Sequence, residues 1–122
     1  MFLHESGEMY LETIYVLSKS NGFVRSIDIS AHMGFSKPSV SRAVGLLRKS
    51  GYINVDKDGG ITLTDSGREI AEKIFERHTV ITNMLIQFGV EPEVAAADAC
   101  KMEHAISDTS LEAIKNFMNK QK

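Results

Sequence analysis

Hydrophobic residues recur every three or four positions along most of the chain, a spacing that is typical of amphipathic helices. In the N-terminal part this pattern predicts a helix around Met9–Leu17 that ends at Asn21 and Gly22. A short helix follows over Ser26–Met33, with Ser26 as its cap, and Gly34 supplies a tight turn after it.

A third helix is predicted directly after this turn. Ser36 is a suitable N-cap because its hydroxyl can accept from a free N–H of the first turn, and Pro38 lacks an N–H at a point where none is needed. Gly51 ends the helix. Its buried stripe is expected to consist of Val40, Val44 and Leu47. Two short helices joined by a glycine turn are typical of a helix-turn-helix.

The pattern then changes to two short β-rich runs that flank Asp58-Gly59-Gly60, a strong hairpin signal. A hairpin at this place is the wing of a winged helix-turn-helix. Helical spacing resumes at Thr64 or Asp65 and continues to about Phe88.

Two further helices are expected after Gly89. One begins near Pro92 and runs to about Ile106, and the last is capped by Thr109 and Glu112. The predicted fold is therefore mainly α with a small β-hairpin wing. Residues 1–72 form a winged helix-turn-helix DNA-binding domain, and residues 73–122 form a helical metal-binding and dimerisation domain.

The composition of the 122-residue chain is ordinary for a soluble globular protein, with 43% hydrophobic and 25% charged residues. Its apolar runs are too short to cross a bilayer, its N-terminus does not resemble a signal peptide, and its one cysteine cannot form an internal disulfide. We therefore expect a cytoplasmic protein without a membrane partner.

The net charge of −2 is unevenly distributed. The C-terminal third is acidic, whereas residues 36–57 carry a single acid, Asp56, and a set of bases. This asymmetry favours DNA contact through one region only. The bases are Lys37, Arg42, Arg48, Lys49 and Lys57.

The third helix would present short polar side chains and cations near its N-terminus, which suit phosphate oxygens and base edges. Arg42 is expected to favour guanine, and the helix N-terminus adds free N–H groups. The alternative is an ordinary three-helix core with a solvated polar face. The candidate DNA-binding residues are Ser36, Lys37, Pro38, Ser39, Ser41 and Arg42.

A second candidate site lies near the C-terminus. Cys100, Glu103 and His104 stand at i, i+3 and i+4, which places a thiolate, a carboxylate and an imidazole on one helix face. His78 lies on the long helix that should pack against this one, while Met9 and Glu12 lie one turn apart on the first helix.

Each of these residues has an ordinary explanation: a buried small hydrophobe, a satisfied histidine, a solvated surface pair. His4 and His32 show no partner pattern and are interpreted as surface histidines. The spacing also resembles the H-x-x-E-H helix of metalloproteases with Cys100 in place of the first histidine, but few residues follow His104, so we expect no enzyme.

The chain resembles the metal-dependent repressors of the diphtheria-toxin-repressor and manganese-transport-regulator family. The resemblance rests on EMYLETIYVL, SKPSVSRAVGLLRKSGYI, LTDSGREIAEKIFERH and DACKMEHAISD, and it spans nearly the whole chain. It implies a metal-responsive repressor of metal-uptake genes. It also implies metal ligands at Met9, Glu12, His78, Cys100, Glu103 and His104, with Glu12 matching the manganese-type branch.

Two departures from the family pattern matter. Thr82 and Ala96 stand where the iron-type branch has two ligands of a second site, so that site is not expected here, nor is a C-terminal SH3-like domain. Met9 and Cys100 are sulfur ligands where the manganese-type branch has carboxylates. Because Mn(II) is hard and gains least from soft ligands, we expect Fe(II) as the working divalent ion and Mn(II) second.

The expected mechanism is ordering by metal: an ion ties the first helix to the fifth and shifts a homodimer toward the form that binds a palindromic double-stranded DNA operator. The alternative is a winged-helix regulator that senses an organic ligand or redox state without a metal, although no organic ligand is expected. The apolar residues assigned to the dimer surface are Met84, Leu85, Val94, Ile106, Leu111, Ile114, Phe117 and Met118.

Overall fold

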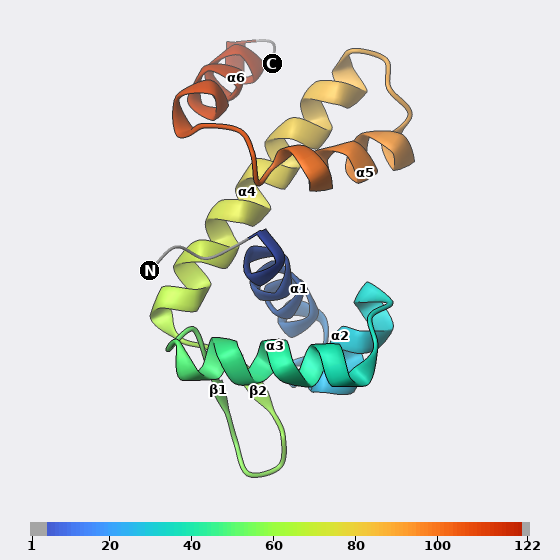
Figure 1. The fold of residues 1–122 in the computed structure, drawn as a ribbon. Coiled ribbons are helices and arrows are strands. Elements are labelled where there is room, and N and C mark those ends of the chain that lie inside the picture. The colour runs from blue at the N-terminus through green and yellow to red at the C-terminus, as the bar shows by residue number, and fades with distance from the viewer. Residues whose placement is uncertain (1–4, 121–122) are drawn as a thin grey trace. The chain divides into compact units, whose positions relative to one another are not determined.

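The computed structural model describes residues 5–120, and within them it contains six helices and one antiparallel hairpin (Figure 1). The chain divides into two compact units, the first ending at Glu72 and the second beginning at Lys73, and one long helix contributes to both. The elements are α1 (Glu5–Asn21), α2 (Ser26–Met33), α3 (Lys37–Lys49), β1 (Ile53–Val55), β2 (Ile61–Leu63), α4 (Asp65–Gln87), α5 (Pro92–Met102) and α6 (Asp108–Lys120).

The predicted fold class, mainly α with a small hairpin, is confirmed. None of the helices in residues 5–120 combines the length and apolarity that spanning a bilayer requires. His32 is exposed, as expected, and His4 lies outside the described residues.

The first unit packs α1, α2 and α3 against the hairpin around an apolar core. In the hairpin Ile53 pairs with Leu63, and Asp56 Oδ1 accepts from the N–H groups of Asp58 and Gly60 at 2.9 and 2.8 Å. The Ile61 N–H also donates to the carbonyl of Val24 at 2.7 Å, which fastens the wing to the linker between α1 and α2. The fully buried aliphatic residues are Leu11, Ile14, Val24, Ile29, Val40, Ile53 and Ile61.

The helix ends of this unit follow the predicted pattern with one exception. Ser36 caps α3 by accepting from the Ser39 N–H at 3.3 Å. Arg25, rather than Ser26, is the N-cap of α2, because the Asp28 carboxylate accepts from the Arg25 N–H at 2.9 Å. The carboxylate that pairs with the N–H of the N-cap residue therefore belongs to Asp28, the third residue of the helix itself.

The second unit contains the rest of α4 together with α5 and α6, and its buried centre consists of Ile81, Ala99 and Leu111. The predicted end of α5 near Ile106 is wrong, because the helix stops at Met102. Ser107 then caps α6 by accepting from the Ser110 N–H at 3.1 Å, so the predicted cap at Thr109 is wrong as well. The chain needs a tight turn between these helices, and that turn carries part of the candidate site.

Candidate metal centre and DNA-binding face

The turn after α5 places a carboxylate between two imidazoles in the interior of the second unit. Glu103 is fully buried, and its Oε2 lies 2.8 Å from Nδ1 of His78 on α4. Its Oε1 lies 3.3 Å from Nε2 of His104. A buried carboxylate requires a compensating partner, and carboxylate and imidazole together suit a divalent transition ion. The donor set therefore fits such an ion.

A buried arginine holds this turn in place. Arg77, which precedes His78 on α4, donates from Nη1 to the carbonyls of Glu103 at 3.1 Å and Ile106 at 2.6 Å. Its Nη2 donates to the carboxylate of Asp108, the first residue of α6. A continuing helix would have paired the two carbonyls internally, so Arg77 stabilises the early end of α5.

Sequence reasoning missed Arg77, although a signal was present. Arg77 lies between the buried residues Ile74 and Ile81 at helical spacing, where an apolar side chain would be expected. A cation at such a position must have partners inside the protein.

The remaining predicted metal ligands lie on two helices. Cys100 is half-buried on α5, forms no disulfide, and keeps helical spacing to Glu103, whose N–H still donates to Ala99 at 2.9 Å. Met9 and Glu12 lie one turn apart on α1 in the first unit, and both are half-buried. The second unit by itself thus brings together His78, Glu103 and His104.

The two positions that depart from the family pattern carry no metal-binding group. Thr82 on α4 and Ala96 on α5 are half-buried. The Thr82 hydroxyl is buried without a hydrogen-bond partner among the described residues. Neither side chain can replace a carboxylate or an imidazole as a ligand of a transition ion.

The candidate DNA-binding residues lie at the N-cap and in the N-terminal half of α3. Ser36, Lys37, Pro38, Ser41 and Arg42 are exposed. Ser39 is half-buried and accepts a hydrogen bond from the Ser36 hydroxyl at 2.9 Å. The exposed side chains can therefore reach a partner without any change in the core.

The predicted supply of free N–H groups at this helix end is smaller than expected. The N–H of Ser39 donates to the Ser36 hydroxyl, and Pro38 has none. Anion binding at this point would depend on side chains rather than on the helix backbone.

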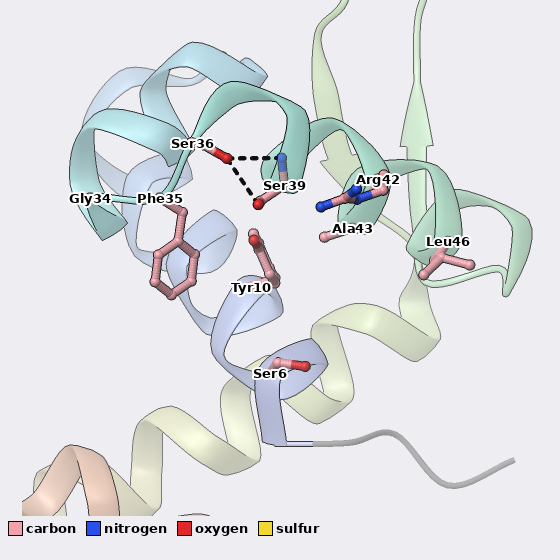
Figure 2. Close-up of a pocket in the computed structure, with 9 residues that line it drawn as sticks. All are labelled: Ser6, Tyr10, Gly34, Phe35, Ser36, Ser39, Arg42, Ala43 and Leu46. Atoms are coloured by element: carbon pink, nitrogen blue, oxygen red, sulfur yellow. Dashed lines mark hydrogen bonds between the residues drawn. The ribbon is translucent and has the colours of Figure 1, made fainter.

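A shallow groove of about 580 Å³ lies between α1 and α3 (Figure 2). Tyr10 of α1 and Arg42 of α3 line it, and Phe35 packs its ring 6.0 Å from that of Tyr10. Burial raises the pKa of the Tyr10 hydroxyl above its ordinary value, and the Arg42 charge opposes this only in part. Tyr10 is therefore protonated at neutral pH and can donate a hydrogen bond into the groove.

The apolar surface of the second unit differs from the predicted set. Leu111 is buried, and Met84, Leu85 and Ile106 pack against the core of the unit itself. Val94 and Phe117 are exposed as expected. Three further exposed apolar residues were not predicted, namely Ile86, Phe88 and Met102.

Comparison with known proteins gives two family matches. A model described as the iron dependent repressor, N-terminal DNA binding domain, matches residues 2–61, and one described as the iron dependent repressor, metal binding and dimerisation domain, matches residues 64–122. An HTH-type transcriptional regulator of Methanocaldococcus jannaschii is 37% identical over 98% of both chains. The transcriptional regulator MntR of Escherichia coli is 36% identical over 91% of this chain and 72% of its own.

Solved structures show the same fold. The manganese regulator SloR superimposes with a TM-score of 0.83 at 28% identity, over 98% of this chain and 55% of that one. A manganese-dependent transcriptional repressor in complex with manganese gives 0.86 at 26% identity, over 93% and 52%. The chain thus spans about half the length of these two structures. Since the two family models together match nearly every residue, the chain belongs to the family of iron-dependent repressors.

Proposed function

We propose that the protein is a metal-responsive DNA-binding transcriptional regulator that represses metal-uptake genes. Residues 1–72 serve as the winged helix-turn-helix DNA-binding domain and residues 73–122 as the metal-binding and dimerisation domain. The observation that carries this proposal is the buried carboxylate of Glu103 between the imidazoles of His78 and His104. It lies in the half of the chain that matches a metal-binding domain.

The proposed metal ligands are His78, Glu103 and His104, joined by Cys100, Met9 and Glu12. A bound divalent ion supplies positive charge to this group of donors. In support of these ligands, the carboxylate of Glu103 lies 2.8 Å from Nδ1 of His78 and 3.3 Å from Nε2 of His104, in a turn that Arg77 stabilises. Met9 and Glu12 are included because of their ligand types and their match to the family pattern. If Met9 and Glu12 also bind the ion, metal binding orders α1 and so shifts the protein toward the form that binds DNA.

The thiol of Cys100 and the thioether of Met9 favour Fe(II) over Mn(II), because the harder Mn(II) gains least from sulfur. Two of the similar solved structures are described as a manganese regulator and a manganese-dependent repressor, so Mn(II) is the second candidate. Met9→Asp is expected to strengthen the response to Mn(II) relative to Fe(II). An unchanged ranking in an anaerobic DNA-binding assay would remove the basis for the preference for Fe(II).

The proposed assembly is a cytoplasmic homodimer on a palindromic operator. The second unit exposes several large apolar residues that support self-association, namely Ile86, Phe88, Val94, Met102 and Phe117. A two-fold dimer would present two copies of α3 to two half-sites. Light scattering at micromolar concentration should give a dimer. A monomer both with and without metal contradicts this part of the proposal.

The function is tested by selecting DNA sequences from a random duplex library with the full chain and Co(II), an oxidation-resistant substitute for Fe(II). We expect a preferred sequence whose affinity collapses with a chelator and weakens steeply with salt. His78→Ala should abolish the metal response and keep the sequence preference. Arg42→Ala should relax one base position by about 1–3 kcal/mol and keep the metal response. Equal affinity with metal and with chelator would favour an organic-ligand or redox sensor, for which the relatives offer no support.

A further inference from the structure

One large apolar side chain is exposed on the basic face of α3. Leu46 is 66% exposed, whereas the packing residues of this helix, Val40, Val44 and Leu47, are at most 8% exposed. Leu46 lies one turn after Arg42 and one turn before Lys49, both exposed cations. The helix contains no acidic residue. Packing within the first unit therefore does not account for this leucine.

Leu46 belongs to a stripe that faces the groove of Figure 2. Ser39, Arg42, Ala43 and Leu46 follow one another at spacings of three, one and three residues, and all four line the groove. A partner of this stripe must be anionic and must also offer a small apolar group between its polar ones. The major groove of DNA meets both conditions, because it combines phosphates with the C5-methyl group of thymine.

An acidic protein surface fits less well. Stable protein interfaces place aromatic and apolar residues together at a centre from which charge is depleted. Leu46 instead stands between Arg42 and Lys49 along the helix. The arrangement matches a surface that alternates charge with single methyl groups.

We propose that Leu46 recognises the methyl group of a thymine in the operator. The proposal rests on the function proposed above and adds a specificity determinant to it. Residues four positions apart on a helix are separated by about 6 Å. Base pairs are spaced by about 3.4 Å. The thymine should therefore lie about two base pairs from the base that Arg42 contacts.

The test uses the full chain with Co(II) and the operator selected from the random library. Each thymine is replaced singly by deoxyuridine, which removes the methyl group and preserves base pairing. At one thymine of each half-site we expect roughly fourfold weaker binding, the loss of one buried methyl-sized contact. Leu46→Ala should bind the thymine and deoxyuridine operators equally at that position, and Leu46→Met should retain the difference. Ile27→Ala, a control at a 58% exposed apolar residue of α2, should behave like the wild type.

The outcomes separate this inference from the proposed function. A metal-dependent operator with no thymine that responds to deoxyuridine overturns the role of Leu46 and leaves the function intact. The same holds if the response persists in Leu46→Ala. A chain that selects no metal-dependent sequence overturns both. Because Leu46 is exposed, its variants should keep the circular dichroism spectrum of the wild type, and Leu46→Gln provides a second test in which the apolar contact is replaced by a polar group of similar length.

Discussion

Replacing Arg77 by methionine should destabilise the second unit by about 2–3 kcal/mol. Methionine fills much of the same apolar space but cannot donate to the carbonyls of Glu103 and Ile106, which Nη1 contacts at 3.1 and 2.6 Å. An unsatisfied buried carbonyl costs about 1–3 kcal/mol. We assign about 2 kcal/mol to the buried carbonyl of Glu103 and about 1 kcal/mol to the partly buried carbonyl of Ile106.

The contact of Arg77 with Asp108 contributes little to this sum. The Asp108 side chain is 70% exposed, against 9% for Arg77, so water can replace the arginine as its partner. Removal of Arg77 also removes a buried Nε that has no hydrogen-bond partner within residues 5–120, which offsets part of the loss. The structure thus predicts an asymmetry: Arg77→Met is costly, whereas Asp108→Asn changes the free energy of unfolding far less.

Urea denaturation with a chelator present measures both variants. Far-UV circular dichroism follows both units, whereas tyrosine fluorescence follows only the first, because Tyr10, Tyr15 and Tyr52 are the three tyrosines of a chain without tryptophan. Arg77→Met should shift the circular dichroism transition more than the fluorescence transition. A loss below 1 kcal/mol, or an equal loss for Asp108→Asn, would refute the assignment of Arg77 as the residue that holds the turn.

Three further predictions concern single residues. Glu103→Gln should keep the fold but lose the stabilisation by Co(II) in thermal denaturation, which for the wild type is about 2.7 kcal/mol at a hundredfold excess over Kd. Asp108→Asn, the control, should retain this stabilisation, and a retained shift in Glu103→Gln refutes the assignment of Glu103 as a ligand. Gly67→Ala should lower the free energy of unfolding by about 3 kcal/mol in urea denaturation, because the added Cβ would lie 2.0 Å from the Tyr52 carbonyl oxygen. The Cβ of Gly45→Ala meets nothing within 4 Å, so this control should be neutral or slightly stabilising. Equal urea midpoints for the two variants contradict this prediction. Hydrogen bonds from Arg77 and, second, from Lys73 hold the pKa of the Asp108 carboxyl below its ordinary value of 3.8. The ionised carboxyl therefore stabilises the folded protein fully above pH 3.8, and this stabilisation is lost as the pH falls through the lower pKa of the folded state. Below that pKa, wild type and Asp108→Asn should have the same stability.

Local signals in the sequence were sufficient for the secondary structure of the first unit. Ser36 caps α3 through its own hydroxyl, and Asp56 closes the hairpin through N–H groups two and four residues away. Such contacts join neighbours in the chain, so residue type and spacing predict them. The residue types at 78, 103 and 104 likewise indicated a metal site before any geometry was known.

Other features depended on residues far apart in the sequence. The end of α5 at Met102 is stabilised by Arg77, which is 26 residues from Glu103, and helical periodicity contains no information about such a partner. Leu111 and Phe117 both belong to the apolar residues of α6, and packing against α4 and α5 decides that Leu111 is buried whereas Phe117 is exposed. Amphipathic spacing shows that a helix has an apolar face, but the tertiary structure decides which members of that face form the core and which remain available to a partner.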